Sequence, residues 1–210
     1  MLLKGDDDEF RGWRRMKLKD RYSVVAITLH WIIAALIVTN IGVAWYFNTL
    51  HGLARLSPLA LHQSIGLTVL VLSVLRLAWR LANPPPKLPD YVVGWERWLA
   101  SAVHVGFYVI MIGLPLTGWA MRSASPFHHI LPIKLFSLPW PVIGPLASLP
   151  QDQAKTAESA FEAAHGLLGK LTYGLIALHV AGALKHQFIS RDDVVGRMIP
   201  FLQKKTAVQP

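Results

Sequence analysis

Histidine is the residue type in this sequence best suited to hold a metal. The 210-residue chain has nine histidines and no cysteine, which excludes disulfides, iron–sulfur clusters and thiolate zinc sites. Any metal must therefore be bound by histidine, carboxylate or methionine side chains. Four of the histidines, His30, His62, His165 and His179, lie inside long apolar blocks. An ionisable side chain in such a block is costly to bury, so each of the four is expected to have a partner or a role.

The spacing of His165 and His179 is informative. On one helix, fourteen residues span roughly 21 Å along the axis, and they leave the two side chains within about 40° of the same face. The stripe between them reads Gly169, Thr172 and Ile176. Gly169 is small enough for a flat ring to lie against the backbone. One helix therefore presents two imidazoles to the same neighbours at two different depths.

Four apolar blocks position these histidines. Hydrophobic residues make up 53% of the chain and charged residues only 16%, and each block has the length needed to cross the hydrocarbon core as a helix. The sequence predicts an all-α, integral membrane four-helix bundle, up-down-up-down. The expected helices are about 24–47, 60–81, 98–121 and 157–189. They belong to a transmembrane domain at 22–190, between a polar N-terminal segment (1–21) and a tail (191–210). The proline-rich connection at 122–158 is expected to lie on the outer interface.

The distribution of Lys and Arg predicts the orientation. The N-terminal segment holds seven of these residues, the stretch from Arg76 to Arg97 four and the tail from Lys185 onward five, against one and three in the other two connections. The heavily basic side is expected to be cytoplasmic, with both termini inside. The net charge of +9 is therefore assigned to membrane topology and lipid headgroups, and no nucleic-acid partner is expected.

The expected depths sort the four histidines into two pairs. His62 and His165 fall in the outer half of the bundle, and His30 and His179 fall in the inner half. Two facing imidazoles among apolar side chains suit six-coordinate haem iron, whereas zinc would need three or four ligands at each level. The alternatives are histidines that only pack through hydrogen bonds, or a histidine relay for protons or ions. Such a relay would usually bring Asp or Glu into the interior of the membrane blocks.

Several short motifs accompany these histidines. They are Arg21-Tyr22-Ser23, Leu29-His30-Trp31, Leu61-His62-Gln63-Ser64-Ile65-Gly66, Pro84-Pro85-Pro86, Gly113-Leu114-Pro115-Leu116-Thr117-Gly118, Ala164-His165-Gly166, Leu178-His179 and Lys185-His186-Gln187-Phe188. In these motifs, residues 20–200 resemble the bacterial cytochrome b561 family of di-haem inner-membrane proteins. The resemblance implies a multi-pass protein with two b-type haems per chain. Its axial ligands would be His30 with His179 and His62 with His165.

The resemblance leaves three functions open. The first is electron transfer between the quinone pool, with ubiquinone as substrate, and a periplasmic or membrane redox partner. The second is an enzyme acting alone, a superoxide:ubiquinone oxidoreductase similar to superoxide oxidase. The third is a haem-carrying membrane anchor subunit of a larger dehydrogenase. No side chain is assigned as catalytic in any of the three.

Five further residues are candidate contacts of quinone or of haem propionates. His186 lies seven residues after His179 and would continue its stripe, and His104 lies near the start of the third block. Arg76 and Arg80 end the second block and could pair with propionates. Lys170 lies in the fourth block and could attract an anion. The plainer alternatives are interfacial histidines and cations that orient the helices or extend to water.

Overall fold

The computed structural model of the chain describes residues 22–84, 94–127, 129–191 and 194–199. Within these ranges, four helices are long and apolar enough to cross a membrane, so the predicted four-helix membrane bundle is confirmed. The expectations for 1–21 and for most of 191–210 lie outside the described residues. The four long helices are α2 (Val24–Asn48), α3 (Leu56–Ala82), α4 (Gly94–Ala124) and α6 (Gln151–Leu184).

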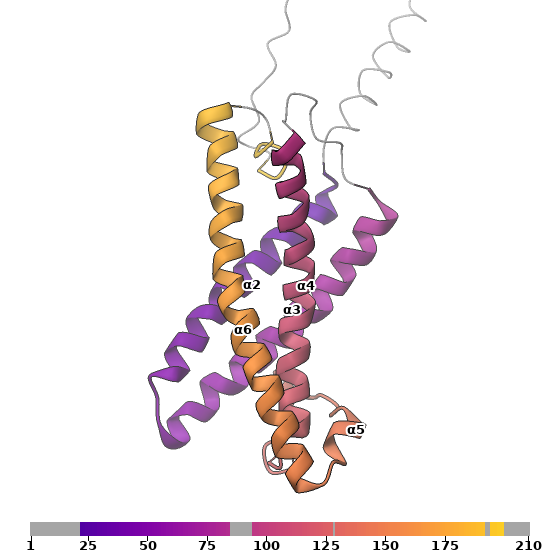
Figure 1. Cartoon of the computed structure of the whole chain (residues 1–210), viewed down its shortest axis with the longest axis vertical. Coiled ribbons are helices and arrows are strands. Elements are labelled where there is room, and N and C mark those ends of the chain that lie inside the picture. The colour runs from indigo at the N-terminus through magenta and orange to yellow at the C-terminus, as the bar shows by residue number, and fades with distance from the viewer. Residues whose placement is uncertain (1–21, 85–93, 128, 192–193, 200–210) are drawn as a thin grey trace, which may run out of the picture.

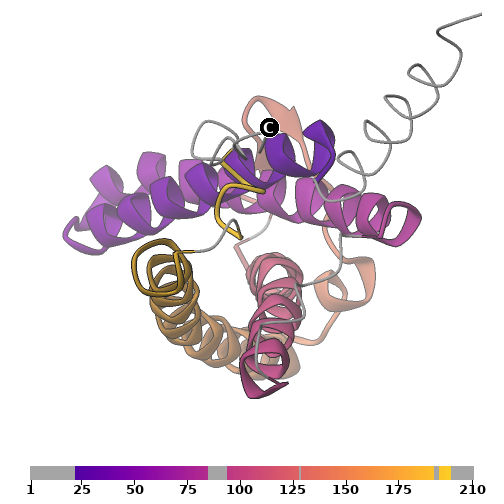
Figure 2. The same ribbon diagram turned by 90° about the horizontal axis from the view of Figure 1, so that it is seen from above.

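The helices form two crossed layers (Figures 1 and 2). One layer is the antiparallel hairpin of α2 and α3, which are joined through the short helix η1 (Gly52–Arg55). The other layer is α4 with α6. In the described part of the chain, close backbone approach between long helices occurs for α4 with α6, α2 with α3, and α3 with α4. The two layers are therefore joined chiefly where α3 meets α4.

Local chemistry explains several helix ends. The Ser23 hydroxyl accepts a hydrogen bond from the Ala26 amide at 3.2 Å and caps the start of α2. Helix α6 begins at Gln151, before the expected start at 157, because the helix extends past the apolar block and Asp152 suits its positive N-terminal end. At its other end, α6 widens into the π-helix η2 (Lys185–Ser190), which stops at Arg191 in the left-handed conformation.

The connection between α4 and α6, residues 125–150, forms a structure that we call the cap. It contains the short hairpin β1 (Lys134–Leu135) and β2 (Leu138–Pro139), followed by the turn α5 (Gly144–Ala147). Two buried serines fasten it to the bundle. The Ser64 hydroxyl of α3 accepts from the Phe136 amide at 2.9 Å and donates to the Lys134 carbonyl at 3.1 Å. The Ser123 hydroxyl of α4 accepts from the Ile143 amide at 3.0 Å.

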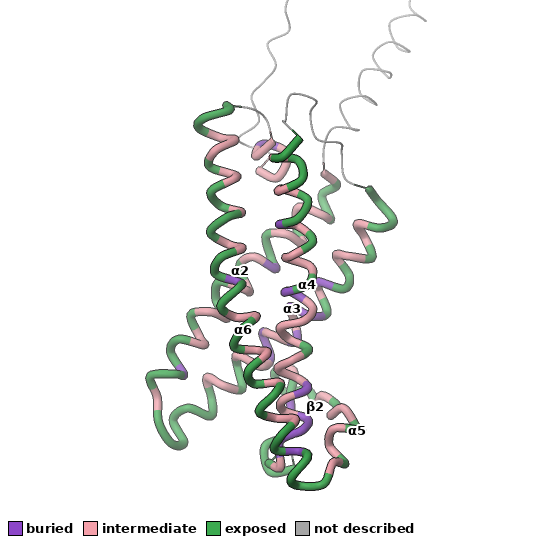
Figure 3. The backbone as a smooth tube through the Cα atoms, in the orientation of Figure 1, coloured by how far each residue is buried: buried purple, intermediate pink, exposed green. Residues whose placement is uncertain are grey.

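The small apolar core lies where the layers cross. Ile33 of α2, Ile65 and Val69 of α3, and Met111 of α4 form one buried cluster. Much of α6 and the far end of the α2–α3 hairpin are exposed (Figure 3). An apolar surface of this kind is what lipid would cover, since lipid tails are as apolar as the side chains that face them. The buried apolar side chains therefore form a band midway along the bundle.

Candidate haem sites

The structure brings the four block histidines together in two pairs, each formed across the two layers. His30 of α2 faces His179 of α6, with ring centroids 6.1 Å apart. His62 of α3 faces His165 of α6, with ring centroids 6.2 Å apart. We call the first the terminal-end pair, because it lies toward the start of α2 and the end of α6. The second is the cap-end pair, because it lies toward residues 125–150.

Backbone carbonyls hold both rings of the cap-end pair. His62 Nδ1 lies 3.3 Å from the carbonyl oxygen of Asn40 in α2. His165 Nδ1 lies 3.0 Å from the carbonyl oxygen of Leu114 in α4. A carbonyl oxygen can only accept, so Nδ1 must carry the hydrogen in each ring. The lone pair is then on Nε2, which is the state that a metal-binding imidazole needs.

Helix α4 supports His165 with two further groups. The Thr117 hydroxyl donates to the Leu114 carbonyl at 2.7 Å, and its oxygen lies 3.2 Å from His165 Nδ1. The ring N–H is therefore shared between the Leu114 carbonyl and the Thr117 hydroxyl. Gly118 gives the ring its room, since a Cβ there would lie 3.1 Å from His165 Cε1 and 3.3 Å from Nδ1. These residues come from the Gly113–Gly118 motif, to which the sequence reasoning assigned no role.

Comparison with known proteins places the chain in a family. Residues 21–201 match the family described as "Prokaryotic cytochrome b561". The chain belongs to the prokaryotic cytochrome b561 family. Two relatives come from Escherichia coli K12: "Cytochrome b561 homolog 2" is 30% identical over 86% of this chain and 92% of its own length, and "Cytochrome b561 homolog 1" is 26% identical over 86% and 98%. "Probable superoxide oxidase CybB" of Yersinia pestis is 28% identical over 86% and 96%.

Membership of the cytochrome b561 family establishes the general function. The chain is a membrane protein of electron transport, and the family implies b-type haem. The bacterial inner membrane fits both its relatives and its four membrane-length helices. The recognised family and the general function predicted from the sequence are thus confirmed.

The histidine pairs of this cytochrome b561 fit the dimensions of a haem. A metal–imidazole bond of about 2 Å on each side, with the half-width of each ring added, separates two ring centroids by roughly 6 Å. Both pairs have this separation. A Cβ added at Gly169, between the two histidines of α6, would meet no atom within 4 Å, so the backbone there can accept a flat ring. In the described part of the chain, no three His, Asp or Glu side chains gather as a metal site.

The surroundings of the terminal-end pair are aromatic and basic. The His104 ring lies 5.7 Å from the His179 ring and the Phe107 ring 5.3 Å from it, both edge-on. The charge of Arg76 acts on His30, His104 and His179. The sequence placed His104 near this depth but did not predict its contact with His179.

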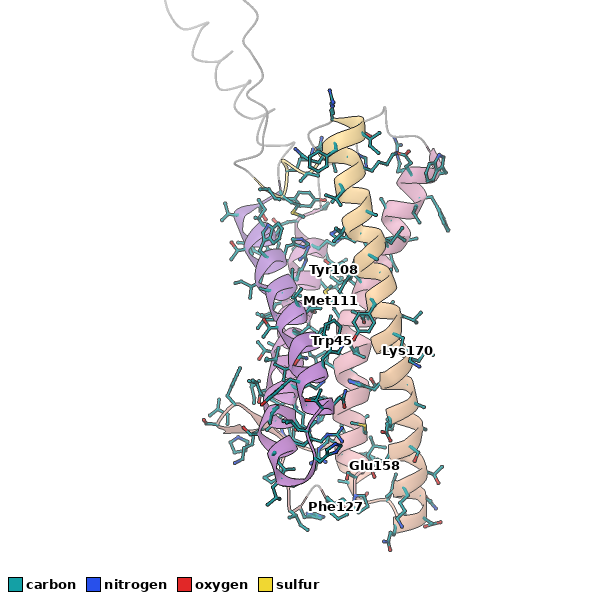
Figure 4. All side chains as sticks on the ribbon, turned by 90° about the vertical axis from the view of Figure 1, so that its left-hand side faces the viewer. Trp45, Tyr108, Met111, Phe127, Glu158 and Lys170 are labelled. Atoms are coloured by element: carbon teal, nitrogen blue, oxygen red, sulfur yellow. The ribbon has the colours of Figure 1, made fainter. Side chains whose placement is uncertain are left out.

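The structure brings Arg80 to the terminal-end region but does not bring Lys170 to either pair. The Arg80 guanidinium lies 5.9 Å from the centre of the Tyr108 ring, which faces the space between the layers. His186 is half-buried in η2, where the wider turn interrupts the 3.6-residue period that aligned it with His179. Lys170 is exposed and points away from the α2–α3 layer (Figure 4).

Proposed function

We propose that this cytochrome b561 binds two b-type haems per chain and exchanges electrons between them and the quinone pool. His30 and His179 would ligate one iron and His62 and His165 the other. Two histidines on each iron would leave no ligand position open, so the bound haems would supply one-electron transfer rather than oxygen binding. The observation that carries the proposal is the matched separation of the two imidazole pairs, 6.1 Å and 6.2 Å.

Quantification of haem in the purified protein tests this proposal directly. The expected result is two haems per chain and a reduced-minus-oxidised spectrum of the b type. One haem per chain, or a high-spin spectrum with an open axial position, would contradict the ligand assignment.

The N-terminal segment, the connection after α3 and the tail would face the cytoplasm because they are rich in Lys and Arg. Reaction of single introduced cysteines with a membrane-impermeant thiol reagent tests this orientation.

The terminal end offers the groups that a quinone or a haem propionate would need. Arg76 and Arg80 can pair with propionates through charge-assisted hydrogen bonds. His104 donates its Nδ1 hydrogen to the Ala100 carbonyl at 2.6 Å, which leaves Nε2 as an acceptor beside His179. We infer that His104 contacts the quinone and that Arg76 contacts a propionate. The variant His104→Phe should keep both haems and raise KM for a soluble quinone. Loss of a haem would instead assign His104 to haem binding.

Superoxide is a second candidate substrate. The supporting observation is the relative named "Probable superoxide oxidase CybB", which matches 86% of this chain. In such a reaction two superoxide ions each lose one electron and become dioxygen, and these two electrons with two protons convert one quinone to the quinol. Stopped-flow mixing of oxidised protein with superoxide should reduce the haems faster than superoxide dismutates. Haems that stay oxidised would remove this candidate.

An anchor role is a third candidate, and the cap is the observation that favours it. Four apolar side chains of the cap are more than half exposed. They are Phe127, Ile130, Phe136 and Leu138. A redox partner docked at the cap would cover these side chains. Isolation from native membranes in mild detergent tests this role, because a stable partner should co-purify. An isolated monomer that reduces quinone with full activity would contradict it.

A further inference from the structure

The two histidine pairs differ in what their ring nitrogens contact. Both Nδ1 atoms of the cap-end pair have backbone carbonyls within hydrogen-bond distance. In the terminal-end pair, neither His30 nor His179 makes a hydrogen bond to another described residue, and the neighbours are rings and the charge of Arg76. The ligands have the same chemistry at both ends, so a difference between the two sites must come from these surroundings.

A hydrogen bond from Nδ1 changes the electron donation of a histidine ligand. When the ring N–H is held by an acceptor, the ring becomes more basic and donates more strongly through Nε2. Stronger donation stabilises ferric iron relative to ferrous iron, which lowers the reduction potential. His165 has two acceptors on its N–H, the Leu114 carbonyl and the Thr117 oxygen. The cap end would therefore favour the oxidised state of a haem bound there.

Positive charge has the opposite effect at the terminal end. Reduction removes one positive charge from the iron, so a nearby cation favours the reduced state. Arg76 acts on both histidines of the terminal-end pair. Among the described residues, no arginine or lysine acts comparably on His62 or His165: the charge that acts on His62 is that of His165. The terminal end would therefore favour the reduced state of a haem bound there.

We propose that Leu114, Thr117 and Gly118 of α4 make the cap-end site the lower-potential site, so that electrons run from the cap end to the terminal end. Thr117 and Gly118 are positioning residues that act through His165. With haem held by both pairs, the one electron lost at the cap end would be the one gained at the terminal end, and no proton would need to move. This inference rests on the proposed di-haem function.

Gly118 provides the sharpest test because its steric contact with His165 is specific. In Gly118→Ala, the new Cβ would press on the ring at 3.1–3.3 Å and move Nδ1 away from the Leu114 carbonyl. Gly113 is the matched control on the same helix, since a Cβ there would lie at an ordinary 3.7 Å from Leu168. Both variants replace a glycine with alanine within α4, so their effects on helix propensity are matched.

The experiment is a redox titration of the purified holoprotein, followed by absorbance and by the low-spin ferric signals in electron paramagnetic resonance. Two one-electron components are expected. Gly118→Ala should raise the lower potential by about 59 mV, a tenfold change for one electron, and leave the higher one in place. Gly113→Ala should change neither. The variant His179→Ala, which keeps the cap-end pair, should titrate at the lower potential and so assign the component.

Thr117 provides a second test if Gly118→Ala loses haem. Thr117→Val removes one of the two acceptors and should raise the lower potential by less than Gly118→Ala, and Thr117→Ser should restore it. Thr68→Val is the control, because the Thr68 hydroxyl donates to Ser64 O within its own helix. A shift of the higher component, or no shift in either, would overturn the inference. Fewer than two haems in the wild-type protein would instead contradict the proposed function itself.

Discussion

The cap end and the terminal end of the bundle present the same ligand pair in two different settings. At the cap end, the carbonyls of Asn40 and Leu114 hold the rings. At the terminal end, the rings meet His104 and Phe107 and the charge of Arg76. The histidines determine which cofactor can bind, whereas the groups behind them determine how the two bound cofactors differ. Identical ligands do not make equivalent sites.

The largest expected effect is the loss of a single haem. His165→Ala should remove the cap-end haem and His179→Ala the terminal-end haem, each leaving about one haem per chain, because one imidazole cannot complete six-coordination alone. A pyridine haemochromogen assay measures the content. His51→Ala, at an exposed histidine before η1, should keep both haems. Equal loss of both haems in either variant would mean that the two ends do not bind independently.

A tenfold effect is expected from the charge at the terminal end. Arg76→Leu removes the cation that acts on His30 and His179, so the higher potential should fall by about 59 mV, a tenfold change for one electron. Lys170→Leu is the charge-matched control, because Lys170 is exposed and points away from the sites. Redox titration of both variants checks the contrast. A fall in the lower potential would place Arg76 at the other haem.

A smaller effect is expected at the cap end from Ser64→Ala. This change removes the acceptor of the part-buried hydrogen bond from the Phe136 amide, which costs about 1 kcal/mol. Hydrogen exchange should become faster at the Phe136 amide, while the higher potential stays constant. Ser101→Ala is the control, since the exposed Ser101 hydroxyl only bonds to Arg97 O on its own helix. Faster exchange along the whole of α2 would show that the cap is not a local feature.

The smallest expected effect is a loss of thermal stability that does not belong to either end alone. Trp45 of α2 donates from Nε1 to the Tyr173 hydroxyl of α6 at 2.9 Å and so links the two layers between the two histidine pairs. Trp45→Phe should cost about 1 kcal/mol, which lowers Tm by about 2–4 °C for a chain of this size. Tyr46→Phe, next to it, is the control, because it removes the hydroxyl of an exposed tyrosine. A shift in only one potential would make Trp45 part of that site.

The sequence predicted the long helices and the four paired histidines because those features depend on short-range rules. Apolar length predicts a membrane span, and the fourteen-residue spacing on α6 follows helix geometry. The proximity of the pairs is present in the structure, and their role as haem ligands stays a proposal.

The hydrogen bonds behind the histidines could not be predicted, because they join residues far apart in the chain. His165 meets the Leu114 carbonyl across 51 positions, and a backbone carbonyl leaves no signature in side-chain types. The same holds for Ser64 with Phe136, across 72 positions. The Gly113–Gly118 motif was the one visible signal, since a glycine inside an apolar helix often marks a close approach of another group.

The crossed layers have a consequence for how the protein matures in the cell. Each hairpin can form from adjacent segments as the chain enters the membrane, but both histidine pairs bridge α6 to the α2–α3 layer. Backbone approach between the layers is concentrated at α3 and α4. Bound porphyrin would therefore add contacts between α6 and the α2–α3 layer that the polypeptide alone does not make. A ligand that binds the assembled state stabilises it by mass action. Cells short of haem should therefore contain less of this protein, because membrane proteases degrade chains whose two helix layers have not packed together.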